Sequence, residues 1–280
     1  SSAQQYFHTF CGVLRVLMLF VAGVVVVAIL LGKSPLTLFA GLGATSAVLM
    51  LVFKDTITGL ASGVRLTSND MLHKGDWITV KSVDANGIVE EMSLTTVKVR
   101  NFDNTIVTIS PTTLVNGSFQ NWIGMQNSGG RRVKRLVYFD FRSIRLVDDL
   151  LKQKLISKHF ATEDSFKLKE SLQKALEKDR QEGKDIEDLK NPAALAPTNL
   201  QLYRKFMEKY LRQRPEINTE LTLMVRHLEA TQCGLPIEFY FFIKDKVWVN
   251  YEHILADIME HAYALANEFE LKIYEQYPEQ

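Results

Sequence analysis

The hydrophobic pattern divides the chain into an apolar N-terminal part and a mixed remainder. Within residues 11–53 the only formal charges are Arg15 and Lys33, and nearly all other charges come later. Two apolar runs, residues 11–31 and 36–53, flank a short turn of Gly, Lys, Ser and Pro. Each run has close to the roughly 20 residues with which a helix crosses about 30 Å of hydrocarbon. The pattern therefore predicts two transmembrane helices, in residues 1–33 and 34–70.

The second apolar run differs from the first in its many small residues. Ala40, Gly41, Gly43 and Ala44 follow one another closely, whereas a helix that faces only lipid gains nothing from small side chains. Small residues let helix backbones approach one another. Two interpretations remain open, an ordinary helix pair packed through a glycine face and a helix that packs against copies of itself around an axis.

Helical spacing continues past the second apolar run, although the sequence becomes too polar to span a membrane. Lys54 and Asp55 introduce charge and Gly59 follows, so we predict a bend there. The next residues, 57–66, carry an apolar face and predict an interfacial helix that lies along the bilayer surface. That face consists of Ile57, Leu60, Ala61 and Val64.

Positive charge is distributed unequally on the two sides of the predicted helix pair. Lys54, Arg65 and Lys74 follow the second helix, whereas the short turn between the helices carries Lys33 alone. Because Lys and Arg are enriched on the cytoplasmic side of membranes, we expect the large C-terminal region to lie in the cytoplasm.

Short β-branched runs replace the helical pattern in residues 71–128. Turn residues at 84–87 and 103–104 separate the runs, which predicts four or five strands in a small β-barrel or open sheet. We assign Asp76 and Asp103 to turns rather than to catalysis. The predicted strands are residues 77–80, 88–91, 96–99 and 106–109.

Residues 129–280 have the pattern of an α+β domain. The expected order is strand, helix, strand, strand, helix, which suits a split αβ sandwich. These elements are predicted at residues 132–141, 143–159, 221–228, 237–249 and 251–274, with apolar stripes that include Ile144, Val147, Ile254 and Tyr263.

A Lys- and Glu-rich helical insertion occupies about residues 160–215 of that domain. Leu168, Leu172 and Leu176 recur at four-residue spacing, and Pro192 and Pro197 interrupt the pattern. The composition predicts exposed helices. Either a solvated charged face or a docking surface for neighbouring subunits accounts for it.

Several ordered motifs resemble those of the small-conductance mechanosensitive channels, the MscS family. The resemblance covers about residues 36–125 and begins with the run of residues 41–66. Two departures are Pro111-Thr112, where the family usually has Pro-Asn, and the charged pair Lys54-Asp55, which is uncharged in the best-known member. The later motifs are Lys74-Gly75-Asp76-Trp77-Ile78, Gly87-Ile88-Val89-Glu90, Thr95-Thr96, Phe102-Asp103-Asn104, Ile109-Ser110-Pro111 and Asn121.

The resemblance implies a homo-heptamer with one pore helix per subunit, in the inner membrane of a bacterium. It also implies an Sm-like β-barrel for the small β-domain, and the long insertion matches the larger members of the family. Matched onto this sequence, the apolar rings that close the pore fall at Ala47 and Leu51. Expected partners are membrane lipids, permeating ions and small solutes.

Composition and motif searches give no support for other chemistry. The net charge of +1 argues against a nucleic-acid partner, which needs a clustered basic surface. Cys11 and Cys233 are far apart in sequence, and the six histidines form no ligand motif, so we expect no metal site, no cofactor and no catalytic residues. The sequence therefore predicts a tension-gated channel that releases ions and small solutes on hypo-osmotic shock. The alternative is a membrane-anchored scaffold or regulatory module without a conducting pore.

Overall fold

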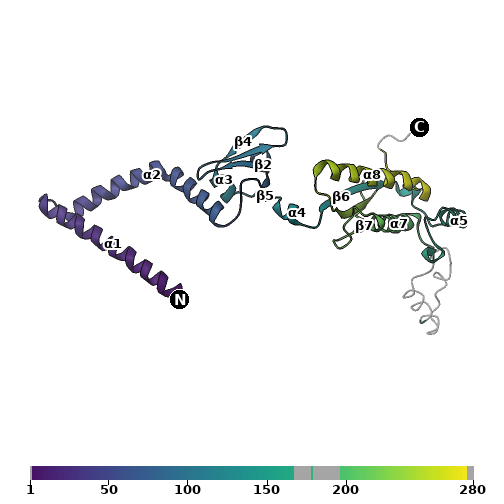
Figure 1. Ribbon diagram of the computed structural model, residues 1–280, viewed down its shortest axis with the longest axis horizontal. Helices are drawn as coiled ribbons and strands as arrows, with labels where there is room; N and C mark the ends of the chain where they lie inside the picture. Colours follow the sequence, from purple (N-terminus) through teal and green to yellow (C-terminus); the bar gives the residue numbers. More distant parts are fainter. Residues whose placement is uncertain (1, 167–177, 179–195, 276–280) are drawn as a thin grey trace. The chain divides into compact units, whose positions relative to one another are not determined.

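The computed structural model describes residues 2–166, 178 and 196–275 (Figure 1). The chain divides into two compact units, Ser1–Trp122 and Ile123–Gln280. The first holds two long helices and a small β-domain, and the second is an α+β domain. The predicted combination of N-terminal helices, a β-domain and a C-terminal α+β domain is present.

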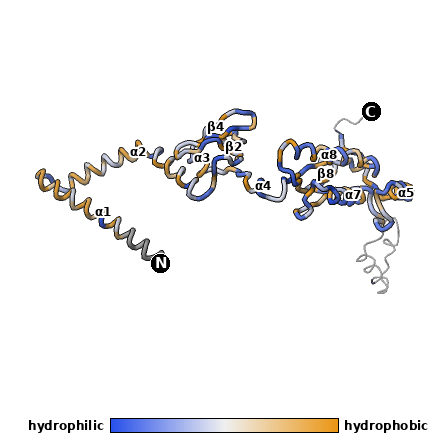
Figure 2. The backbone as a smooth tube through the Cα atoms, viewed as in Figure 1, coloured by the Kyte–Doolittle hydropathy of each residue, from blue (hydrophilic) through white to orange (hydrophobic). Residues whose placement is uncertain are grey.

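Helices α1 (Ser2–Leu30) and α2 (Pro35–Ser68) form the N-terminal part of the first unit. The turn between them places Gly32 at φ 60°, where a glycine is favoured, and Pro35 stands in the first turn of α2. Both helices are long and apolar enough to cross a membrane, with mean hydropathies of 2.9 and 2.1 in their most apolar windows (Figure 2).

Helix α2 is continuous from Pro35 to Ser68, and its second half holds the segment predicted to lie along the bilayer surface; that placement stays a prediction. Residues 57–66 belong to the second half of α2; the segment contains Gly59 and Gly63 but no proline, so the backbone hydrogen bonds of the helix continue through it. The ribbon of α2 changes direction partway along its length (Figure 1). The assignment of that bend to Lys54, Asp55 and Gly59 stays a prediction.

The β-domain is a five-stranded antiparallel sheet in the order β4-β3-β2-β1-β5. Its core combines alternate strand residues such as Ile78 and Val99 with Leu66 of α2 and Leu114 of α3. The Sm-like barrel stays a prediction. The elements are β1 (Trp77–Val80), η1 (Lys81–Val83), β2 (Ala85–Met92), β3 (Val97–Asn101), β4 (Ile106–Ile109), α3 (Pro111–Asn116) and β5 (Gln120–Asn121).

The first turn of the β-domain lies earlier than the sequence predicted. Lys81–Val83 forms a short 3-10 helix and Asp84 takes φ 51°, whereas residues 85–87 belong to β2. Gly87 is needed for close strand packing rather than for a turn, since a Cβ there would lie 1.9 Å from the carbonyl oxygen of Arg100.

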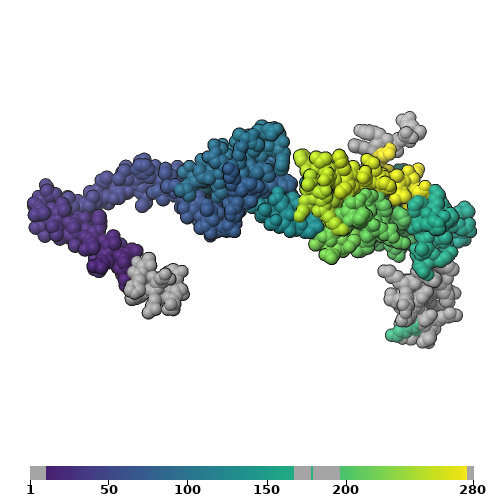
Figure 3. All heavy atoms as spheres, viewed as in Figure 1, coloured from purple at the N-terminus to yellow at the C-terminus, as the bar shows by residue number. Residues whose placement is uncertain are grey.

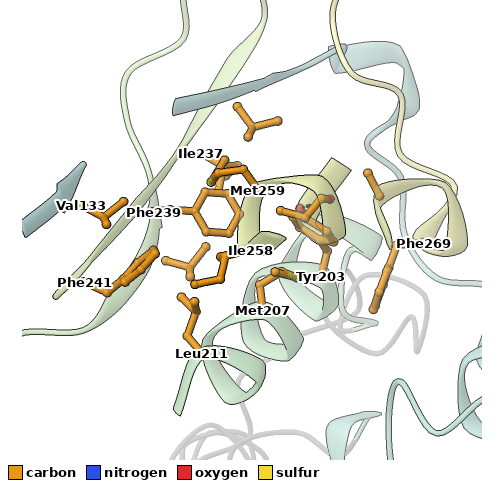
Figure 4. Packing of buried hydrophobic residues seen from close by; sticks show 14 of the residues in the cluster. Val133, Tyr203, Met207, Leu211, Ile237, Phe239, Phe241, Ile258, Met259 and Phe269 are labelled. Carbon is orange, nitrogen blue, oxygen red and sulfur yellow. Dashed lines mark hydrogen bonds between the residues drawn. The ribbon is translucent and has the colours of Figure 1, made fainter. Parts of the chain in front are cut away.

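The C-terminal unit is a three-stranded antiparallel sheet, in the order β6-β8-β7, covered on one face by helices. Phe239, Ile258, Tyr203 and Phe269 are among the buried residues of its core (Figure 4). The elements are α4 (Ile123–Asn127), β6 (Arg131–Phe139), η2 (Phe141–Ser143), α5 (Asp149–Ser157), η3 (Glu163–Phe166), α7 (Asn199–Gln213), β7 (Met224–His227), β8 (Leu235–Ile243), α8 (Trp248–Ala266) and η6 (Asn267–Phe269).

Three element boundaries in this unit correct the sequence prediction. The helix expected at 143–159 begins only at Asp149, because the Asp148 carboxylate accepts a hydrogen bond from the Leu151 amide at 2.8 Å and caps it. The strand expected to reach residue 249 ends at Ile243, and Trp248 begins α8. Helix α8 ends at Ala266 instead of residue 274.

Part of the predicted insertion at 160–215 is a core element rather than an exposed helix. Helix α7 occupies residues 199–213 and buries Leu202, Tyr203, Met207 and Leu211. The charged residues between these positions concealed its apolar stripe. Leu168, Leu172, Leu176, Asn191 and Pro192 lie outside the described residues.

Replacing Thr198 with alanine is expected to lower the free energy of unfolding by about 1 kcal/mol. The Thr198 hydroxyl accepts a hydrogen bond from the Gln201 amide at 3.0 Å and caps α7. The midpoint of thermal unfolding measures the loss. Thr198→Ser keeps the acceptor and should stay close to the unsubstituted protein; equal losses in both variants would contradict the capping role.

Candidate pore-lining helix

The first half of α2 has an apolar surface that the isolated chain leaves uncovered. Every residue in 40–58 is exposed, and the Leu51 side chain is 74% exposed. The hydroxyl of Thr45 donates to the Gly41 carbonyl oxygen at 2.9 Å, so this polar group is satisfied within the helix. Such a surface requires lipid or other protein around it.

One stripe of α2 collects the residues that the sequence assigned to the pore. Ala40, Ala44, Ala47 and Leu51 recur at intervals of three or four residues, which places them on one helix face. The stripe is narrow and small at its start and ends in a large apolar side chain. The assignment of Ala47 and Leu51 as a gate stays a prediction.

Gly41 and Gly43 flank this stripe on opposite sides of the helix. A Cβ at either position would meet nothing within 4 Å in the isolated chain, so both glycines leave open room for a neighbouring backbone. Leu42 and Leu49 lie on the face away from the stripe. The helix thus has a small-residue side with two open flanks and a large-residue side.

The second half of α2 is fixed to the β-domain. Ser62, Gly63 and Leu66 are buried there, and Leu66 is fully buried among the sheet residues. A Cβ on Gly63 would lie 2.2 Å from the carbonyl oxygen of Leu94, in the turn between β2 and β3. The sequence analysis missed this contact because nothing local identifies Leu94 as a neighbour of Gly63.

The predicted apolar face of this half remains exposed. Ile57, Leu60 and Val64 are 55%, 39% and 53% exposed, on the side of α2 away from Ser62 and Gly63. Helix α2 has 34 residues and is about 51 Å long, well above the roughly 30 Å of bilayer hydrocarbon. Only its first half therefore needs to span the membrane.

Two aspartates of the β-domain have structural roles, as the sequence predicted. The buried Asp76 carboxylate accepts hydrogen bonds from the His73 amide at 3.1 Å and from Asn121 Nδ2 at 2.8 Å. The Thr105 hydroxyl and amide donate to Asp103 and hold the pKa of that carboxyl below its ordinary value of 3.8. Both residues fix loops.

Within the described part of the chain, no group of three or more His, Cys, Asp or Glu side chains could hold a metal ion. Cys11 and Cys233 are free thiols.

The segment that contains the β-domain matches known proteins. The family model of the mechanosensitive ion channel β-domain matches residues 55–124. The chain is 34% identical to the small-conductance mechanosensitive channel MscMJ of Methanocaldococcus jannaschii over 84 residues, 30% of this chain and 23% of that protein. It is 29% identical to the large-conductance channel MscMJLR of that organism over 105 residues, 38% of this chain and 28% of the relative. The chain thus spans about a quarter of the length of these relatives.

Two solved structures share the fold over nearly the whole chain. Arabidopsis thaliana MSL1 matches with a TM-score of 0.59 at 12% identity, covering 94% of this chain and 74% of MSL1. Helicobacter pylori MscS in its closed state matches with a TM-score of 0.54 at 13% identity, covering 96% and 81%.

Residues 55–124 thus resemble the β-domain of mechanosensitive ion channels, and they adjoin two helices that are long and apolar enough to cross a membrane. The resemblance to the MscS family that the sequence predicted is confirmed, on its β-domain and the adjoining half of α2.

Proposed function

We propose that this chain is a subunit of a homo-oligomeric mechanosensitive channel in which α2 lines the pore. The observation that supports it best is the single helix with an uncovered small-residue stripe, running directly into a β-domain of the mechanosensitive-channel type. Copies of α2 pack through Ala40, Gly41, Gly43 and Ala44 around a common axis. The resemblance implies seven copies.

The closed gate consists of rings of Ala47 and Leu51, one turn apart. An ion that enters a narrow ring of leucines loses hydration without gaining polar contacts, which costs far more than thermal energy. Such a ring also dewets, so the closed pore excludes ions without any plug. Membrane tension favours the state with the larger area in the bilayer plane, in which the ring widens and becomes wet.

The membrane placement follows from the same helices. Residues 11–30 and the first half of α2 cross the membrane, and the region after α2 lies on the cytoplasmic side, which is the side of Lys54, Arg65 and Lys74. In a bacterial inner membrane this arrangement releases ions and small solutes on hypo-osmotic shock. The exposed Ile57, Leu60 and Val64 provide contacts to lipid or to neighbouring subunits.

Recording from reconstituted membrane patches under suction tests the proposal. We expect stepwise currents that appear at a reproducible tension and are absent from patches without protein. Patches that contain the oligomer but rupture without current would refute the channel function. The mass of the protein in mild detergent distinguishes the second candidate, since a monomer cannot enclose a pore with one such helix and would instead fit a membrane-anchored scaffold.

A further inference from the structure

Among the described residues 123–166 and 196–275, the helices cover only one face of the sheet of the C-terminal unit. Val133 and Val137 of β6 and Phe239 and Phe241 of β8 point into the helix-covered core. Because successive strand residues alternate between faces, the even-numbered neighbours lie on the opposite face. This bare sheet face consists of Arg132, Lys134, Leu136, Tyr138, Met224, Arg226, Pro236, Glu238, Tyr240 and Phe242.

The composition of the bare sheet face is that of a protein interface. Tyr240 and Phe242 are half-buried and meet edge to face with ring centroids 5.9 Å apart. The Arg132 guanidinium lies 6.0 Å from the centroid of Tyr240. Tyr, Phe, Met and Arg are the side chains enriched where proteins bind proteins.

This face also has an excess of positive charge. Glu238 is the one acidic side chain among these positions and is fully buried, 2.7 Å from Arg226 and 3.6 Å from Lys134. Its single negative charge offsets one of three cations. Arg132, Lys134 and Arg226 thus leave a net positive surface beside the aromatic pair.

Helix α8 has an exposed stripe with acidic rather than basic residues, on the side of the helix away from the sheet. Val249, Ala256 and Tyr263 recur every seven residues on the exposed side, and Val249 is 60% exposed. Asp257 and Glu260 lie beside them and are exposed, and α8 contains no Lys or Arg. These five residues form the outer stripe of α8; yellow-green atoms of this part of the chain lie on the surface in Figure 3.

We propose that the outer stripe of α8 in one copy docks on the bare sheet face of the next copy, in an inference that rests on the homo-oligomer of the proposed function. The acidic stripe matches the basic face in charge. The dimensions also match, since α8 has 19 residues and is about 28 Å long, and the nine residues of β8 span about 30 Å.

The arrangement of the two surfaces determines the symmetry. Helix α8 packs on one face of the sheet through Leu255 and Ile258, so its outer stripe and the bare sheet face point in opposite directions. Contact between unlike surfaces repeats from copy to copy, and it closes into a ring when the rotation between copies is a whole fraction of a full turn. A like-to-like dimer would instead need one self-complementary surface, which like charges on either surface oppose.

Disulfide trapping in the full chain tests the contact. Leu136→Cys on the sheet face and Ala256→Cys on the outer stripe are combined in a background with Cys11→Ser and Cys233→Ser. After oxidation in membranes, we expect a ladder of covalent multimers on a denaturing gel. Each single-cysteine variant should stay monomeric, and an equal mixture of the two should stop at dimers.

Charge reversal provides a matched control for specificity. Glu260→Arg in the double-cysteine chain should lower the yield of multimers by about tenfold, because it places like charges together. Adding Arg132→Glu should restore the yield, whereas Glu220→Arg, an exposed acid outside both surfaces, should not change it.

The outcomes separate this inference from the proposed function. If the oligomer has its expected mass but the double-cysteine chain gives no multimers, the docking is wrong and the channel proposal stands. Self-linking of either single variant also overturns it. If the double variant does not reach the membrane, carbodiimide coupling of the unsubstituted chain, mixed from isotopically light and heavy copies, decides: we expect amide links from Lys134 to Asp257 or Glu260 between copies, and their absence refutes the contact.

Discussion

Leu51→Ser is expected to lower the membrane tension at which the protein opens. The leucine ends the small-residue stripe of α2 with a side chain that the isolated chain leaves 74% exposed. Burying a leucine side chain is worth about 1.5–3 kcal/mol, and replacement by serine removes most of this apolar contribution. In a ring the change is repeated in every copy. A hydroxyl ring holds water, so the barrier against ions falls. The suction needed for half-maximal current in reconstituted patches measures the effect.

Leu49→Ser is the matched control for that substitution. Leu49 lies two residues away on the large-residue side of α2, and it is also exposed in the isolated chain. The Leu49→Ser substitution makes the same chemical change on the helix face away from the small-residue stripe. The opening tension should therefore stay near that of the unsubstituted protein. Equal shifts in both variants, or none at Leu51, would place the gate elsewhere.

Gly63→Ala is expected to loosen the junction between α2 and the β-domain. The added Cβ would lie 2.2 Å from the Leu94 carbonyl oxygen, a backbone atom that cannot rotate away. Overpacking of this kind costs about 1–3 kcal/mol. Because about 1.4 kcal/mol corresponds to a factor of ten, the Ser93 amide in the β2–β3 turn should exchange its hydrogen about tenfold faster.

Hydrogen exchange followed by mass spectrometry checks this prediction, and Gly59→Ala is its control. A Cβ on Gly59 meets nothing within 4 Å, so the variant removes a helix glycine without a clash. Exchange in the β2–β3 turn should then stay unchanged. If both variants exchange alike, the contact between Gly63 and Leu94 does not hold the helix.

The sequence predicted those elements whose signals are local. Two apolar runs with a Gly-Pro turn, and β-branched runs that match β1 and β4, give their structures directly from spacing. The turn before β2 was misplaced because Gly87 has a role in strand packing that resembles turn chemistry. Helix α7 was assigned to an exposed insertion because charged residues interrupt its apolar stripe.

Only the part of the candidate site that lies within a single helix could be predicted from the sequence. The stripe from Ala40 to Leu51 follows from helical spacing, and its meaning follows from the family resemblance. The contact between Gly63 and Leu94 joins residues 31 positions apart and depends on how the β-domain folds. No local pattern contains such information, so the junction required a structure.

The continuity of α2 sets how force can travel through the subunit. Its C-terminal portion is fixed to the β-domain by Ser62, Gly63 and Leu66, while residues 40–58 are exposed in the isolated chain. A tilt of the first half of α2 is either transmitted to the β-domain or absorbed by bending of the helix between its two halves. In the proposed channel the β-domain therefore resists movement of α2, and a change in the rigidity of this domain should shift the opening tension without any substitution in residues 40–58.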